Sequence, residues 1–243
     1  IVVGDGVSYE FAQDIIEKVS KEYTLSKEHQ YIFAGLPSET EHNMSQLYID
    51  SGTVVKDKQD REAYLLKQNK DKLIGFIDLE KVNETSDKEH YIICSYKDPD
   101  KLGETYQHKA LKYFDLVAGI FATKIEQLFK NGYQNVYLVT DHGFVLTGIL
   151  DNSDKIEVDF KGNVKISERF IRSENKQKID TNLLIEKEVV YNNFNYSYFA
   201  KRLGPFKSTG VYGFSHGGLS PQETIIPFLK WSNDNNTQDQ VQV

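Results

Sequence analysis

Side chains that bind divalent metal ions recur directly after the predicted strands of this sequence. In chain order they are Asp5, Thr40, Asp98, Asp100, Asp141, His142 and His216. The carboxyl ends of the strands in an open α/β sheet surround its ligand site, so we expect these side chains to meet. Carboxylates and imidazoles bind zinc, manganese and similar ions. Two such ions about 3.5–4 Å apart can hold the attacking and leaving oxygens of a displacement at phosphorus. The pattern therefore predicts a two-metal site for phosphate-ester chemistry.

Strand-like and helix-like segments alternate along the chain, which is typical of a mostly parallel central sheet flanked by helices. The predicted strands cover residues 1–4, 31–35, 91–96, 136–140, 211–214 and 225–229. The predicted helices cover residues 9–23, 42–49, 61–68 and 104–131. Gly132 follows the last helix, where a glycine C-cap is expected. The chain is thus predicted to be an α/β protein.

The stretch over residues 151–200 departs from this alternation. Turn signals at 151–154 and 161–163 separate β-rich runs such as 156–160, which indicates a small β-rich, antiparallel insertion. We expect one domain over residues 1–232, with this insertion inside it, and a frayed polar tail over 233–243. Because the chain opens directly on a predicted core strand, we also expect it to be a domain cut from a longer protein.

The composition is that of a soluble globular protein, with 27% charged and 39% hydrophobic residues. A formal net charge of −7 argues against a broad basic surface for nucleic acid, but it leaves room for a small nucleotide held by metal ions. No run of about 18 apolar residues and no secretory signal is present, so we expect no membrane span and a cytoplasmic location. Cys94 is the single cysteine, so no intrachain disulfide is expected. The oligomeric state stays open.

Four segments of the chain resemble the PglZ family of the alkaline phosphatase superfamily. They cover residues 3–10, 36–40, 140–144 and 216–223. The Asp-His-Gly block at 141–143 and the His-Gly-Gly block at 216–218 are the most specific. The resemblance runs from Asp5 to Pro227 and implies an alkaline phosphatase-like α/β fold. It also implies a setting in bacterial phage-exclusion (BREX) systems, with other defence proteins as partners, or in response regulators with a PglZ output domain.

The same resemblance implies the ligands of the first metal ion. They are Asp5, Thr40, Asp141 and His142. Thr40 would also be the nucleophile, because residues 37–40 are similar to the block of nucleotide pyrophosphatase/phosphodiesterases in which the last threonine attacks. Ser38 is the alternative nucleophile.

The second ion would take Asp100, a partner four residues later, and His216. Relatives have histidine at the partner position, whereas this chain has Glu104. A carboxylate is a harder ligand than imidazole, so Glu104 favours manganese or magnesium over the zinc that is otherwise expected. His108, four residues beyond Glu104 on the same face of the predicted helix, is the alternative ligand. Ser8, where many relatives have arginine, is a second departure from the family pattern.

Structural roles would also explain several of these residues. Helix capping or a place in the first turn of a helix suits Asp5, Ser38, Thr40, Asp100 and Glu104. His216 would otherwise lie exposed in a glycine-rich turn. Glu223, after the His-Gly-Gly block, is a candidate hydrogen-bond acceptor that supports the site from behind the ligands.

With the resemblance, these residues predict a phosphodiesterase that acts on nucleotide-type phosphodiesters with two divalent metal ions. Metal-activated Thr40 would attack phosphorus in line and form a phospho-threonine intermediate. Two other interpretations stay open. One is a scaffold module of a phage-defence complex with little or no activity, which Glu104 and Ser8 favour. The other is a phosphomonoesterase of the same superfamily.

Overall fold

The computed structural model describes residues 1–28, 30–49, 53–83, 89–147, 151–207 and 213–233, and a seven-stranded sheet lies at its centre. Along the sheet the order is β2 (Thr24–Leu25), β13 (Ile225–Ser232), β6 (Asn135–Thr140), β1 (Val2–Gly4), β5 (Tyr91–Tyr96) and β4 (Ile74–Asp78), with β3 (Tyr31–Phe33) also paired to β13. Strands β4, β5, β1 and β6 are parallel to one another, and β13 is antiparallel to β6. The predicted α/β architecture with a mostly parallel sheet is confirmed.

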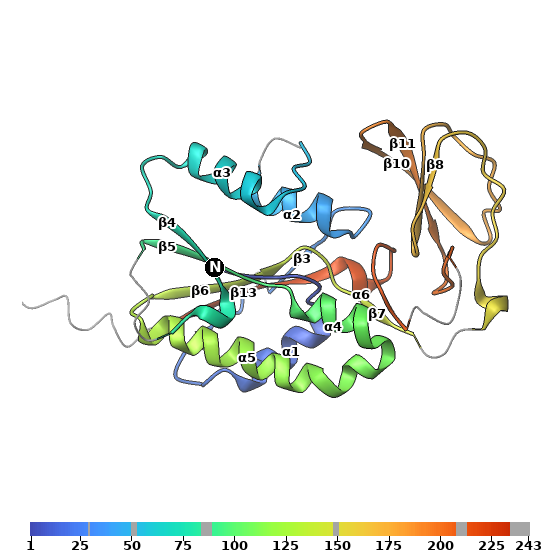
Figure 1. The fold of residues 1–243 in the computed structure, drawn as a ribbon. Helices are drawn as coiled ribbons and strands as arrows, with labels where there is room; N and C mark the ends of the chain where they lie inside the picture. Colours follow the sequence, from blue (N-terminus) through green and yellow to red (C-terminus); the bar gives the residue numbers. More distant parts are fainter. Residues whose placement is uncertain (29, 50–52, 84–88, 148–150, 208–212, 234–243) are drawn as a thin grey trace, which may run out of the picture.

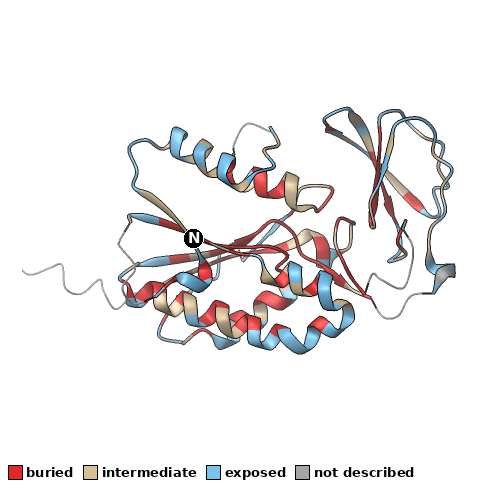
Figure 2. Ribbon diagram, in the orientation of Figure 1, coloured by how far each residue is buried: buried red, intermediate tan, exposed pale blue. Residues whose placement is uncertain are grey.

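Helices cover both faces of this sheet (Figure 1). One face packs against α1 (Tyr9–Lys18) and α5 (Leu111–Lys130), and the other lies beneath α2 (Thr40–Tyr48) and α3 (Lys58–Gln68). Ser8 begins α1 as its N-cap, because its Oγ accepts a hydrogen bond from the backbone N–H of Phe11 at 3.1 Å. The larger core joins α1 and α5 to the sheet through residues such as Ile15, Phe121 and Leu138. Buried residues accordingly line the sheet and the inner faces of the helices (Figure 2).

The single helix predicted over residues 104–131 is wrong. The chain instead forms α4 (Asp98–Tyr106), a 3-10 turn η2 (Gln107–Ala110) and then α5. The break is at Gln107, whose φ of 53° lies outside the right-handed helical region. Glu104 and His108 therefore do not share a helix face. Strand β4, at the edge of the sheet, has no counterpart among the predicted strands, although residues 73–77 form a short apolar run.

Residues 164–200 form a separate antiparallel sheet beside one end of the main sheet (Figure 1). Its order is β10 (Leu184–Tyr191), β11 (Phe194–Ala200), β9 (Phe170–Ser173) and β8 (Val164–Ile166), and we call it the insertion sheet. Ile171, Tyr198 and Phe206 belong to its own small core. The run 156–160, predicted as β-rich, forms no strand and follows a 3-10 turn, η3 (Asn152–Asp154).

A two-stranded ribbon completes the fold near the insertion sheet. It pairs β7 (Val145–Leu146) with β12 (Phe214–Ser215), so the strand before His216 is not part of the central sheet. Residues 211 and 212 of the predicted strand over 211–214 lie outside the described residues, as do residues 234–243 of the predicted tail. The remaining short elements are η1 (Leu79–Lys81) and α6 (Pro221–Thr224). None of the helices in the described part of the chain has the length and apolar character needed to cross a bilayer.

Candidate active site

Three aspartates lie together at the carboxyl ends of the parallel strands of the central sheet. Asp5 follows β1 and Asp141 follows β6, and because these strands are parallel neighbours their carboxyl ends lie side by side. Asp100 is in the first turn of α4, and its backbone N–H donates to the backbone oxygen of Asp5 at 3.1 Å. Gly6 has a φ of 70°, and a Cβ added there would lie 3.0 Å from the Cβ of Asp100. Glycine is thus required at position 6 by both the turn and the close approach.

The deeper group of ligand-type side chains consists of Asp5, Asp141 and His142, and we call it the inner group. Nε2 of His142 lies 3.4 Å from Oδ2 of Asp141 and 3.8 Å from Oδ1 of Asp5. Oδ1 of Asp141 accepts hydrogen bonds from the backbone N–H groups of Gly6 at 3.1 Å and His142 at 2.9 Å. The backbone therefore holds one oxygen of Asp141 and leaves the other facing His142.

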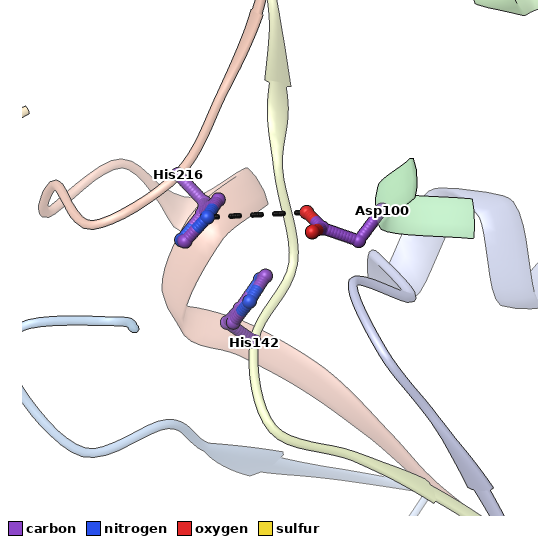
Figure 3. Close-up of side chains that lie close together, drawn as sticks. All are labelled: Asp100, His142 and His216. Carbon is purple, nitrogen blue, oxygen red and sulfur yellow. Dashed lines mark ion pairs between the residues drawn. The ribbon is translucent and has the colours of Figure 1, made fainter. Parts of the chain in front are cut away.

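A second, more open group consists of Asp100, His142 and His216, and we call it the outer group (Figure 3). Nε2 of His216 lies 3.9 Å from Oδ1 of Asp100. The rings of His142 and His216 are stacked, with centroids 3.9 Å apart and planes 7° apart. Burial disfavours a charge on His216, but its carboxylate neighbours, Asp100 foremost, outweigh that effect and raise the pKa of His216. His142 belongs to both groups and links them.

Backbone carbonyls determine which nitrogen of each histidine is free. Nδ1 of His142 lies 2.9 Å from the backbone oxygen of Gly143, and Nδ1 of His216 lies 3.0 Å from the backbone oxygen of Ser38. A carbonyl oxygen only accepts hydrogen bonds, so Nδ1 carries the proton in both rings and Nε2 keeps its lone pair. Histidines that bind metals are oriented in this same way by a partner of the other nitrogen.

Thr40 and Ser38, the two predicted nucleophiles, differ in their contacts. Thr40 begins α2, and its Oγ1 lies 3.0 Å from Nε2 of His142. Ser38 is fully buried, and its Oγ donates to the backbone oxygen of Gly218 and accepts from the backbone N–H of Gly217, both at 3.1 Å. The hydroxyl of Thr40 therefore faces the ligand groups, whereas that of Ser38 joins two loops.

Burial perturbs the ionisation of the whole cluster. Desolvation raises the pKa of Asp5 to about 8, with the nearby charge of Asp141 adding to the effect. Desolvation likewise raises the pKa of Asp100 to about 7 and that of Asp141 to about 6, although the N–H of Gly6 opposes the latter shift. The pKa of His142 is lowered well below its ordinary value, again chiefly by burial. Near neutral pH Asp5 thus retains its proton and Asp100 is partly protonated, and a bound cation would displace these protons.

Comparison with known proteins identifies the family. A family model described as the BREX system PglZ alkaline phosphatase-like domain matches residues 70–231. The chain belongs to this family. It is also similar to the alkaline phosphatase-like protein PglZ of Bacillus cereus (strain H3081.97), with 23% identity over 261 residues that cover 96% of this chain and 30% of the relative. The chain therefore spans less than a third of the length of that relative, and the predicted PglZ resemblance is confirmed.

Solved structures show the same fold in this PglZ domain and in several hydrolases. Human ectonucleotide pyrophosphatase/phosphodiesterase 5 has a TM-score of 0.62 at 12% identity, covering 94% of this chain and 87% of its own. An inactive murine form of that protein, in complex with AMP, has a TM-score of 0.57 at 10% identity, covering 95% and 87%. Phosphonoacetate hydrolase from Sinorhizobium meliloti 1021, in complex with phosphonoacetate, has a TM-score of 0.58 at 9% identity, covering 94% and 88%. At these identities the likeness is one of fold, and the predicted alkaline phosphatase-like fold is confirmed.

The side chains of the PglZ domain fit divalent cations. Oδ1 of Asp5, Oδ1 of Asp100 and Oδ2 of Asp141 are buried and have no hydrogen-bond partner in the described part of the chain. Buried polar atoms normally have a hydrogen-bond partner, so a bound cation would explain why these three oxygens lack one. Two atoms that bind the same zinc ion at about 2.1 Å lie no more than about 4.2 Å apart. The separations of 3.4 and 3.8 Å in the inner group and 3.9 Å in the outer group meet that limit.

Glu104 and His108, the predicted candidates for the remaining outer ligand, are both exposed. Within the described residues, neither belongs to a group of ligand atoms that lie within 4.8 Å of one another. His142 stands in their place in the outer group. The charge of Glu104 still reaches the site, because after burial and Asp5 it is among the causes that raise the pKa of Asp100.

Glu223 supports the loop that carries His216. It is fully buried, it accepts a hydrogen bond from the backbone N–H of Gly218 at 2.7 Å, and it pairs with Arg169 at 3.1 Å. Burial opposes its ionisation, but the hydrogen bonds from Arg169 and Ser220 lower the pKa of Glu223. Arg169 is absent from the predicted site residues. Its signal in the sequence is a charged residue directly before the apolar pair at 170–171, which a pattern search does not separate from a surface arginine.

Proposed function

We propose that this domain is a metal-dependent phosphoester hydrolase with Thr40 as its nucleophile. The observation that carries the proposal is the position of Oγ1 of Thr40, 3.0 Å from Nε2 of His142. That nitrogen is in turn 3.4 Å from an unpartnered oxygen of Asp141. An alcohol placed among carboxylate and imidazole ligands is the arrangement expected of a nucleophile activated by a metal ion.

Two divalent ions would be held by the side chains described above. The inner ion would take Asp5, Asp141 and His142 together with Thr40, and the outer ion would take Asp100 and His216 with His142 beside them. Such ions lower the pKa of the attacking hydroxyl and offset charge on the phosphoryl oxygens. Imidazole and carboxylate ligands in these numbers favour zinc, with manganese as the second choice.

The chain itself orients the nucleophile and the phosphoryl group. Thr40 is the first residue of α2, and the side chain of the N-cap residue Glu39 makes no capping hydrogen bond. The first-turn N–H groups of α2 are thus open to an anion, and the helix dipole favours negative charge there. In the first step the deprotonated oxygen of Thr40 forms a bond to phosphorus while the bond to the leaving alcohol breaks. Water then cleaves the phospho-threonine ester and releases the phosphate product.

A nucleotide-type phosphodiester is the substrate class that we propose. It is supported by the fold shared with ectonucleotide pyrophosphatase/phosphodiesterase 5, whose murine form is described in complex with AMP. The net charge of −7 is consistent with a small substrate rather than a long nucleic acid. The family description places relatives in the BREX system, so we propose phage defence in the bacterial cytoplasm as the setting.

The test is hydrolysis of bis-p-nitrophenyl phosphate and of p-nitrophenyl phosphate with added zinc or manganese. The wild-type domain is expected to prefer the diester, and Thr40→Ala is expected to lower kcat by about 10³-fold or more. Thr24→Ala is the matched control, because Thr24 is exposed on β2. Turnover by Thr40→Ala at the wild-type rate would refute the mechanism. Preference for the monoester would instead identify a phosphomonoesterase.

A non-catalytic scaffold is the second candidate, and the exposure of Glu104 favours it. Without Glu104, Asp100 and His216 are the only ligands among the described residues that the outer group does not share, which weakens binding of that ion. Metal analysis separates the candidates. About two divalent ions per chain and a raised melting temperature on metal addition support the hydrolase, whereas no bound ion and no shift support the scaffold.

A further inference from the structure

One face of the insertion sheet contacts the start of α2, which carries Thr40, and the loop that carries His216. Side chains alternate between the faces of a strand, so Phe170 and Arg172 of β9 lie on the face opposite Ile171. Ile171 belongs to the core of the insertion sheet itself. The face with Phe170 and Arg172 is therefore available to the rest of the domain.

Arg172 is completely buried and makes an ion pair with Glu39, the residue directly before Thr40. Its guanidinium lies 3.7 Å from the ring centroid of Tyr191 and 5.0 Å from that of Phe170. The two aromatic faces and the carboxylate hold the guanidinium plane in one orientation.

Tyr191 contacts the residue on the other side of the nucleophile. Its hydroxyl donates to Oε2 of Glu41 at 2.8 Å. Glu39 and Glu41 flank Thr40, and each is bound by a side chain of the insertion sheet. The first turn of α2 is thus held on both sides of the proposed nucleophile by residues from more than 130 positions later in the chain.

The same strand region holds the loop of His216. Arg169, directly before β9, donates from Nε and Nη2 to the two carboxylate oxygens of Glu223, both at 3.1 Å. Glu223 in turn accepts the backbone N–H of Gly218. A Cβ added to Gly217 would lie 2.8 Å from the ring of Phe170, so the loop packs tightly on β9.

Packing alone does not account for the choice of arginine at position 172. Its Nε and Nη1 have no hydrogen-bond partner among the described residues. Burying unpartnered donors is unfavourable, and a buried ion pair seldom stabilises a fold more than an apolar pair of the same volume. The charge at position 172 is explained instead by the carboxylate that it holds next to Thr40.

We propose that the insertion sheet is a positioning element for the site, in which Arg172 and Tyr191 orient Thr40 and Arg169 orients His216. This inference rests on the proposed function, because it treats Thr40 as the nucleophile. Arg172 acts through Glu39 and contacts no reacting atom. Its loss should therefore misplace the nucleophile and lower kcat, with little change in KM.

Arg172→Met is the main test, measured by kcat and KM for bis-p-nitrophenyl phosphate, by melting temperature, and by hydrogen exchange of residues 36–48. We expect kcat to fall by about 10²-fold, KM to stay within about threefold, and exchange to rise in this segment. Arg172→Lys should restore only part of kcat, because an ammonium lacks the planar fork of the guanidinium. Arg202→Met is the matched control, since it removes an exposed arginine that follows β11 in the same part of the chain.

Several outcomes would overturn the proposal. A folded Arg172→Met domain with wild-type kcat would do so, and so would a raised KM at unchanged kcat, which would make Arg172 a substrate-binding residue. If Arg172→Met does not fold, Tyr191→Phe and Glu39→Gln decide, and each should lower kcat and raise exchange in residues 36–48. If the wild-type domain hydrolyses neither substrate, the proposed function fails, while the exchange measurement still tests the positioning contacts.

Arg169→Met tests the other half of the proposal by zinc titration. The outer ion should bind roughly 10–100-fold more weakly while the inner ion is unaffected, because loss of residues that orient metal ligands has effects of that size. If the outer ion binds Arg169→Met as tightly as it binds the wild-type domain, Arg169 has no role in orienting His216.

Discussion

The inner and outer ligand groups are built on different supports. Asp5 and Asp141 follow directly from two paired parallel strands, and the side chains of Asp141 and His142 have no exposed surface. Asp100 comes from the first turn of α4 and His216 from the loop after the β12 ribbon, and both keep some exposure, at 15% and 22%. The inner group is thus formed by the central sheet itself. The outer group depends on the first turn of α4 and on the loop of His216, which Glu223 and Arg169 support.

This difference indicates that the two ligand groups are held in place by different kinds of contact. The carboxyl ends of interior strands such as β1 and β6 preorganise their ligands, because ladder hydrogen bonds fix the backbone on both sides. Loops outside the sheet need other contacts to reach the same precision, which Ser38, Glu223 and Arg169 supply around His216. Changes in the inner group should therefore have larger effects than changes in the outer group.

Replacement of an inner ligand should have the largest effect. Asp141→Asn removes the charge of a carboxylate that lies 3.4 Å from Nε2 of His142. Loss of the inner ion should lower kcat/KM for bis-p-nitrophenyl phosphate by about 10³-fold or more, since a catalytic metal contributes several kcal/mol to transition-state stabilisation. Metal analysis of the purified variant should show the loss directly. A variant that retains both ions and most activity would contradict the assignment.

Replacement of an outer ligand should have an intermediate effect. His216→Ala leaves Asp5, Asp141 and His142 in place, so one ion should remain bound per chain. We expect kcat/KM to fall by about 10²-fold, because one of two metal contributions is lost. Activity and metal content should be measured on the same sample. An equal loss in His216→Ala and Asp141→Asn would show that the two groups act as one unit.

The stability of the metal-free domain should fall as pH rises from about 4 to about 8. The pKa of Asp5 is raised from 3.8 to about 8 and that of Asp100 from 3.8 to about 7, so the folded state keeps protons that the unfolded chain has already released. Unfolding then releases protons, and the free energy of unfolding decreases with pH across this window.

Urea unfolding in a chelator between pH 5 and pH 9 measures this dependence. Asp5→Asn should flatten it, and added zinc should offset it by binding the folded state. A metal-free domain whose stability stays constant or rises over the same range would contradict the raised pKa values of these carboxyls.

The smallest effect is expected at Glu104. Because its side chain is exposed and outside both ligand groups, Glu104→Ala should change zinc affinity by less than about threefold. Isothermal titration with Glu10→Ala as control, in the first turn of α1, tests this expectation. Loss of one equivalent of zinc from Glu104→Ala alone would instead make Glu104 a ligand.

Local patterns were sufficient to predict much of this fold. The buried strands before Asp5 and Asp141 are visible in the sequence as short apolar runs that end in a polar residue. These runs correspond to β1 and β6. The prediction of one helix over residues 104–131 was wrong because the amphipathic pattern continues across Gln107. The positive φ of Gln107 cannot be deduced from composition. Strand β4 was missed for another reason, since its short apolar run at 73–77 contains Gly75 and follows a highly charged stretch.

By itself, the sequence determined the family, the α/β class and the residue types that converge on the sheet edge, because short motifs and strand periodicity are local properties of the chain. Only the tertiary structure decided that Thr40 rather than Ser38 faces His142, and that Glu104 lies outside the ligand groups. It alone paired Arg172 with Glu39 and Arg169 with Glu223, across 133 and 54 positions. Such pairings depend on how the insertion sheet packs against α2 and α6, and no local pattern records that contact.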